Sequence, residues 1–150
     1  MRKIKVLQVL SPLTVAGAER VVLMLAKNIN RNIFDLSLCL FLNAEKPNNP
    51  FVQEVKRLNI RTQIIYLDKI FDWKQVKSLV SILKKNKIDI LHTNSHRADI
   101  TGYLANKYWT AKLISTVHGW TTATRRLRIY EYFDEKVLDF TIKKFLEGKI

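Results

Sequence analysis

The sequence has little of three residue types that often shape small domains: its 150 residues include one cysteine, four glycines and three prolines. The single Cys39 excludes an internal disulfide and a metal site built from cysteines. It lies in the apolar run 36–42, which predicts a buried strand and fits a reducing compartment. So few glycines and prolines leave no long linker or low-complexity tract, and we expect one domain over residues 1–150.

Long hydrophobic runs are also missing. A membrane-spanning helix needs about 20 consecutive apolar residues, and the apolar runs in this sequence are far shorter. Residues 1–3 lead into a short strand instead of the apolar segment of a signal peptide. We therefore expect a cytoplasmic protein, and peripheral association with the inner face of a membrane stays open.

Acidic residues are scarce relative to basic ones. The chain has 26 Lys and Arg residues against 13 Asp and Glu, a formal net charge of +13. This charge favours anionic partners, such as phosphates, nucleic acid or an acidic membrane surface. The basic residues are spread along the chain, which is typical of solvated helix faces. Nucleic acid is the less favoured partner, because neither a recognition helix nor a basic strand face interleaved with aromatics is evident.

Short runs rich in Val, Ile and Leu alternate with longer amphipathic segments. This alternation is typical of a parallel sheet whose strands are joined by crossover helices. The expected strands cover residues 5–10, 34–42, 62–66, 88–92 and 112–117, and the expected helices cover 21–29, 50–58, 76–83, 97–109 and 127–146. The predicted fold class is therefore α/β, a Rossmann-like, doubly wound, mostly parallel sheet. No strand follows the last helix, so we expect a domain that is incomplete at its C-terminal end.

The first expected strand runs into a turn that contains Gly17. The three-glycine fingerprint of dinucleotide-binding proteins is absent, and no cofactor is expected. Two interpretations of Gly17 stay open. The turn can let backbone amides at a helix N-terminus face an anion or a sugar hydroxyl, or the glycine can simply relieve a tight turn.

Polar residues also follow the fourth expected strand. Ser95 is a suitable N-cap for the next helix. His92 is either a ligand contact or a core histidine, and His96 is suited to the surface. No pair of residues here has the spacing and carboxylate partner of a zinc site, so we expect no metal.

The fifth expected strand ends at His118 and Gly119, where the backbone can approach a ligand closely. An imidazole at this position can donate or accept a hydrogen bond near neutral pH. Arg125, Arg126 and Arg128 follow as the densest arginine cluster of the chain, which suits phosphate oxygens or a solvated loop equally. The turns after the first and fifth strands should flank one ligand site.

Three ordered blocks, residues 16–22, 89–94 and 116–120, together resemble the N-terminal half of family-4-type retaining glycosyltransferases of the GT-B architecture. The resemblance covers about residues 4–139. It implies two Rossmann-like domains across a cleft, with the acceptor held mostly by the N-terminal domain and the nucleotide sugar mostly by the C-terminal one. The chain then looks like the acceptor half, without the donor-binding domain.

The resemblance also assigns site residues. Ala16 and Gly17 would form a loop that reaches the donor phosphates or the acceptor, and His118 would contact the transferred sugar as the catalytic histidine. Asn94 lies in the second block, and Arg97 lies where the family often has a basic residue near the acceptor. Gly119 and the three arginines complete the expected substrate-binding set. The family usually has a second glycine where Ala16 stands, which is a departure from the pattern.

The expected function is hexosyl transfer from a nucleotide sugar to a glycan or lipid-linked acceptor, as in polysaccharide biosynthesis. The chain alone would be inactive or weakly active, and it would need a donor domain in cis or in trans. An anionic membrane surface is a further expected partner. The alternative is a basic membrane-surface or nucleic-acid-binding α/β module without catalysis.

Overall fold

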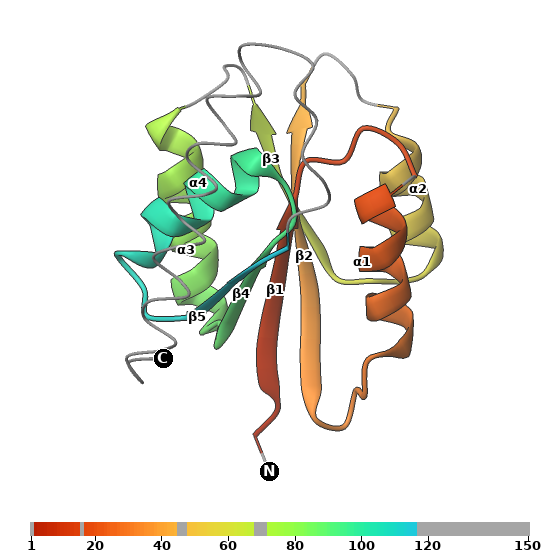
Figure 1. The fold of residues 1–150 in the computed structure, drawn as a ribbon, viewed down its shortest axis with the longest axis horizontal. Helices are drawn as coiled ribbons and strands as arrows, with labels where there is room; N and C mark the ends of the chain where they lie inside the picture. The colour runs from red at the N-terminus through yellow and green to blue at the C-terminus, as the bar shows by residue number, and fades with distance from the viewer. Residues whose placement is uncertain (1, 16, 45–47, 68–71, 117–150) are drawn as a thin grey trace.

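The computed structural model describes residues 2–15, 17–44, 48–67 and 72–116. Strands and helices alternate along these residues (Figure 1). The strands are β1 (Ile4–Leu10), β2 (Phe34–Asn43), β3 (Thr62–Leu67), β4 (Ile90–Thr93) and β5 (Lys112–Ser115). The helices are α1 (Gly17–Asn28), α2 (Pro50–Arg57), α3 (Trp73–Asn86) and α4 (His96–Asn106).

The strands form one sheet in the order β3-β2-β1-β4-β5, and every neighbouring pair is parallel. Helices α1 and α2 cover one face, and α3 and α4 cover the other (Figure 1). From β1 the chain adds β2 and β3 on one side and then returns to add β4 and β5 on the other, so the order of the strands reverses between β1 and β4. This arrangement confirms the predicted α/β class and the five expected strands, whose ends differ from the prediction by a few residues. The helix expected over residues 127–146 lies outside the described residues.

Local sequence signals set the helix ends. The side chains of Asn49, Asp72 and Ser95 accept hydrogen bonds from backbone amides in the first turns of α2, α3 and α4. Such N-caps satisfy amides that have no partner within the helix. The predicted cap at Ser95 is therefore confirmed. At the other end of α3, Lys87 adopts a left-handed conformation with φ of 53° and terminates the helix.

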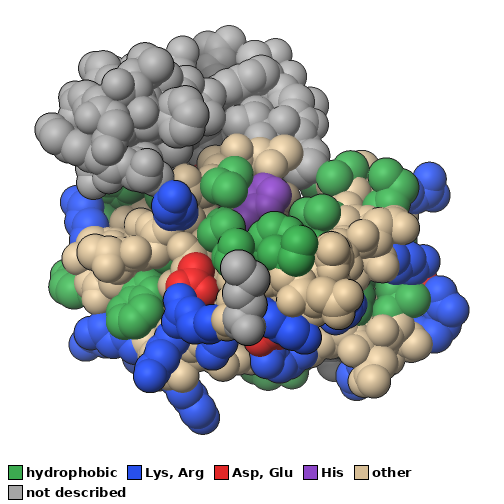
Figure 2. Space-filling view, turned by 90° about the horizontal axis from the view of Figure 1, so that it is seen from below, with side chains coloured by type: hydrophobic (Ala, Val, Ile, Leu, Met, Phe, Trp, Pro, Cys, Tyr) green, Lys and Arg blue, Asp and Glu red, His purple; other side chains and the backbone are tan. Residues whose placement is uncertain are grey.

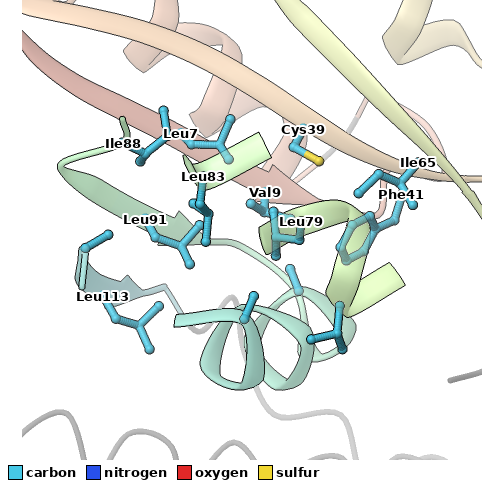
Figure 3. Packing of buried hydrophobic residues seen from close by; sticks show 14 residues of the cluster. Leu7, Val9, Cys39, Phe41, Ile65, Leu79, Leu83, Ile88, Leu91 and Leu113 are labelled. Atoms are coloured by element: carbon cyan, nitrogen blue, oxygen red, sulfur yellow. The ribbon is translucent and has the colours of Figure 1, made fainter. Parts of the chain in front are cut away.

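The strands bury side chains on both faces of the sheet. One core lies under α1 and α2 and includes Val6, Leu10, Val22, Leu38 and Phe51. The second lies under α3 and α4, where Leu7, Val9, Leu79 and Leu91 point toward one another between the sheet and the helices (Figure 3). Because alternate residues of β1 enter opposite cores, a shift of one residue in register would exchange the two sets.

Cys39 lies in β2 within the second core and is fully buried, as the sequence predicted. Burial raises the pKa of its thiol to about 12. The thiol is therefore protonated in the folded protein at neutral pH. The neutral thiol contributes fully to folding stability below about pH 9, the ordinary pKa of a cysteine thiol. This contribution decreases as the pH rises toward 12, because the cysteine of the unfolded chain loses its proton before that of the folded protein does.

We expect Cys39 to react with a thiol reagent at pH 8 about three orders of magnitude more slowly in the native protein than in guanidinium, because so little thiolate is present. A chromogenic disulfide reagent measures both rates on the same sample. Equal rates in the native and unfolded states would contradict the buried position of β2.

Helix α4 approaches β4 closely at Gly102. A Cβ atom at this position would lie 2.6 Å from the Cγ2 methyl of Thr93, which is fully buried. Such a distance is too short for two carbon atoms, so a larger residue must displace the helix or the strand. The glycine therefore allows the close packing of α4 on the sheet.

We expect Gly102→Ala to destabilise the protein by about 1–3 kcal/mol through overpacking. Without a clash, replacing a helical glycine by alanine would instead stabilise the protein by up to about 1 kcal/mol. The sign of the change in unfolding free energy therefore shows whether the clash exists. Urea unfolding measures it. The variant Thr93→Ser removes the methyl and keeps the hydroxyl, and the double variant should recover most of the loss. Additive losses in the double variant would show that this contact is not the cause.

Candidate functional site

The carboxyl ends of β1 and β4 lie side by side at the centre of the sheet. The backbone amide of Asn94 donates to the carbonyl of Val9 at 2.9 Å, which joins the two ends directly. In open α/β sheets, ligands bind at the carboxyl ends of strands where the winding reverses. The β1–α1 loop (residues 11–15) and the start of α4 therefore form the candidate site.

Three side chains hold the β1–α1 loop. The amide of Leu13 donates to Glu19 at 3.4 Å, and Arg20 Nε donates to the carbonyl of Val15 at 3.3 Å. Asn49 Nδ2 donates to the carbonyl of Pro12 at 2.8 Å while the Asn49 side chain also caps α2. The loop is thereby fixed to two helices. Glu19 and Arg20 belong to the block of residues 16–22, but nothing in the sequence of that block indicates their role in the loop.

Gly17 is the first residue of α1, and its φ of +41° is a conformation that favours glycine. It is exposed, and a Cβ built on it would meet no described atom within 4 Å. The prediction of a glycine-dependent turn is confirmed. The open space beside the backbone is compatible with the close approach of a ligand, which stays a prediction.

Asn94 is buried and its amide group is engaged inside the protein. Its Nδ2 donates to Gln8 Oε1 at 3.2 Å and to the carbonyl of His92 at 3.3 Å. Gln8 lies in the middle of β1, fully buried, and its Nε2 has no hydrogen-bond partner among the described residues. The hydroxyl of Ser11, one residue after β1, is likewise buried without one. Such groups are rare in protein interiors and commonly accompany function or bound water.

His92 lies on β4, partly buried, and its Nε2 is 2.6 Å from the hydroxyl of Thr116 beyond β5. This contact links the carboxyl ends of β4 and β5. Of the two interpretations of His92, the structure favours a histidine held by neighbouring protein groups. His96 opens α4 and Arg97 follows it, both partly buried at the same edge of the sheet.

A buried carboxylate connects the carboxyl ends of β4 and β5 to α4. Asp99 lies in the first turn of α4, and one of its oxygens accepts hydrogen bonds from the hydroxyls of Thr93 and, at 2.7 Å, of Ser115. The negative charge near a helix N-terminus is also favoured by the helix dipole. Asp99 therefore fixes the point at which the chain leaves β5.

The structure places Gly17, Asn94 and Arg97 at one edge of the sheet, and their contact with an acceptor stays a prediction. The other predicted site residues, Ala16, His118, Gly119, Arg125, Arg126 and Arg128, lie outside the described residues. Among residues that the structure describes, no group of three or more His, Cys, Asp or Glu side chains is placed to hold a metal ion. No helix in the same part of the chain is long and apolar enough to cross a membrane.

Sequence reasoning missed Gln8, Ser11 and Asp99. A signal was present for Gln8, because a polar residue within the apolar run of β1 is unusual. Asp99 gave no signal, since an acidic residue in the first turn of a helix is common at exposed positions.

Comparison with known proteins assigns the family. The model of Glycosyltransferase Family 4 matches residues 15–147, which is most of the chain. The chain belongs to glycosyltransferase family 4. The family match confirms the resemblance inferred from the three sequence blocks, and the GT-B type of fold agrees with the sheet order and the helix layers described above.

Solved structures agree with this assignment. A glycosyltransferase from Rickettsia africae is 25% identical, with a TM-score of 0.62, over 87% of this chain and 34% of that protein. HepE from Anabaena, solved with UDP and glucose, is 18% identical, with a TM-score of 0.58, over 78% of this chain and 30% of its own. The chain thus spans about a third of the length of these glycosyltransferases.

The same fold occurs in proteins with another activity. A UDP-GlcNAc 2-epimerase from Neisseria meningitidis, bound to UDP-GlcNAc, is 18% identical with a TM-score of 0.56, over 83% of this chain and 38% of that protein. At such identities the likeness concerns the fold alone, so the reaction must be argued from the family and the site. No curated protein matches the chain.

We expect Asp99→Ala to destabilise this family 4 domain by about 2–4 kcal/mol, because the Ser115 hydroxyl loses its acceptor and the Thr93 hydroxyl keeps only the carbonyl of Ile114 at 3.3 Å, in a mostly buried setting. Asp35→Ala serves as the control. Asp35 pairs with Arg61 at 3.0 Å on the surface, and its loss should cost at most about 1 kcal/mol. Urea unfolding of both variants gives the comparison, and equal losses would contradict a special role of the buried carboxylate.

Proposed function

We propose that this chain is the acceptor side of a nucleotide-sugar-dependent glycosyltransferase that transfers a hexosyl group to a glycan or a lipid-linked acceptor. The family match supports glycosyl transfer as the reaction. The donor domain, in cis or in trans, would supply most contacts to the nucleotide. Polysaccharide biosynthesis is the process in which such a reaction would take part.

One observation carries the proposal beyond the family. The N-termini of α1 and α4 follow neighbouring strands and point to the same edge of the sheet, and the backbone at Gly17 is open there. Backbone amides at a helix N-terminus carry a positive partial charge that attracts an anion. A donor diphosphate gains negative charge as its bond to the sugar breaks, so these amides would stabilise it as a leaving group.

The side chains at this edge would serve the acceptor. Arg97 in the first turn of α4 adds a positive charge, and the buried Asn94 would act indirectly, since its bond to Gln8 fixes the ends of β1 and β4. Retaining transfer requires the acceptor hydroxyl and the sugar to be aligned on one face, which depends mainly on positioning. His118, which the resemblance assigns to the transferred sugar, belongs to the same proposal.

The decisive variant is Gly17→Asn, tested in an enzyme that joins this chain to a donor domain. Asparagine tolerates positive φ better than other side chains, so the turn should be kept while the open space is filled. If a ligand approaches the backbone here, kcat/KM should fall at least about tenfold with an unchanged melting temperature. Full activity in a folded variant would mean that Gly17 serves only the turn.

The chain alone should transfer no sugar and should bind nucleotide sugars only weakly, because one wall of the site is missing. Calorimetric titration with uridine and guanosine diphosphate sugars measures donor binding, and a radiolabelled assay with lipid extract as acceptor measures transfer. Micromolar donor binding or turnover by the isolated chain would contradict the assignment to the acceptor side. Lipid binding by the joined protein without any transfer would favour a membrane-surface module.

A further inference from the structure

Basic side chains gather at the end of the molecule opposite the candidate site. All five strands begin there and the helices return to it, so strand starts and helix ends lie together (Figure 1). Seen from this end, Lys and Arg side chains form much of the visible charge (Figure 2). We call this surface the basic end, and its members are Arg2, Lys3, Lys5, Lys27, Arg31, Lys84, Lys85, Lys87, Lys107 and Lys112.

Acidic side chains on the neighbouring strands offset little of this charge. Asp89, just before β4, forms an ion pair with Arg2 and also accepts a hydrogen bond from the amide of Lys5 at 2.8 Å. Asp35, at the start of β2, pairs with Arg61. Among the residues described at this end, both carboxylates are therefore already engaged with cations or backbone. A strong positive potential remains over the basic end.

Helix dipoles explain only part of the pattern. Lys84 and Lys85 lie in the last turn of α3, where a positive charge is favourable. Lys87 and Lys107 are the C-caps of α3 and α4, where the dipole also favours a positive charge, and Lys107 Nζ lies over the Tyr103 ring at 4.9 Å. Arg2, Lys3 and Lys112 are exposed on or just before strands, where no helix dipole acts, and like charges close together are costly.

Exposed apolar side chains lie among these cations. Ile33, just before β2, is 49% exposed, and Tyr108, just after α4, is 60% exposed. Ile4 at the start of β1 is exposed as well. Cations interspersed with large apolar side chains are typical of surfaces that rest in the headgroup region of a bilayer.

We propose that the basic end docks the protein on an anionic lipid bilayer. The occupant is a lipid surface and not a nucleic acid, because the lysines stand on separate helix ends, loops and strand starts. Lys74, Lys77, Lys84 and Lys85 share the exposed face of α3, but only Lys84 and Lys85 lie at the basic end. The exposed Ile33 and Tyr108 beside the lysines favour a bilayer over a duplex. The inference is independent of catalysis, since the candidate site lies at the other end of the strands.

Helix α3 offers a matched pair of variants. Lys84 and Lys85 lie at the basic end, whereas Lys74 and Lys77 lie in the first turns of the same helix, and all four are exposed. K84Q/K85Q and K74Q/K77Q each remove two positive charges, so net charge is the same in both variants. A difference in lipid binding then reports the position of the charges.

The 150-residue chain is tested by co-sedimentation with vesicles of phosphatidylglycerol and phosphatidylcholine, and with phosphatidylcholine alone. We expect K84Q/K85Q to weaken binding to the anionic vesicles by about 30-fold, since each lysine near such a surface contributes about 1 kcal/mol. K74Q/K77Q should weaken it less than about threefold. Binding of the native chain should fall when salt rises from 0.1 to 0.5 M.

Several outcomes would overturn the proposal. They are equal losses in the two double variants, equal binding of the native chain to neutral and anionic vesicles, and displacement from the vesicles by short duplex DNA at equimolar phosphate. Circular dichroism confirms that both variants are folded. The sugar-transfer activity of the chain joined to a donor domain is measured without lipid vesicles. A lack of transfer would therefore contradict the proposed function and would leave the vesicle-binding result unaffected.

Discussion

The parallel pairing of β1 with β4 is the contact on which both ends of the molecule depend. It joins segments more than 80 residues apart, with Gln8 opposite His92 and Val9 opposite Thr93. Backbone hydrogen bonds extend the pair at both ends, from Asp89 to Lys5 and from Asn94 to Val9, each at 2.9 Å. Without this register, the two helix N-termini would not meet at one edge, and the cations of β1 would not adjoin those of α3.

Buried polar groups make the arrangement of the strands specific. Gln8 of β1 accepts from Asn94, which fixes β1 against β4, and Asp99 of α4 accepts from Thr93 and Ser115, which fixes β4 against β5. A buried polar group that loses its partner costs more than the bond contributes when formed. A shifted register would leave these groups without partners in an apolar interior. They therefore disfavour other strand registers that hydrophobic packing alone would tolerate.

The sequence allowed the elements to be predicted because their signals are local. Alternating apolar runs marked the strands, and Ser95 marked the start of α4. The roles of Gln8 and Asp99 depend on residues far along the chain or on another strand, and no local pattern reports such a pairing. Gly17 was predicted as a turn glycine from its position after a strand, and its positive φ follows from the same local geometry.

The length of β1 sets a distance between the two ends. Seven residues at about 3.3 Å each place the starts and the carboxyl ends of the strands roughly 20 Å apart. A domain that rests on a bilayer through its strand starts would therefore hold its reaction site well above the headgroups. The sheet would act as a spacer that selects acceptors by reach: a sugar attached directly to a lipid would fall short, whereas the outer end of a chain several sugars long would arrive at the site.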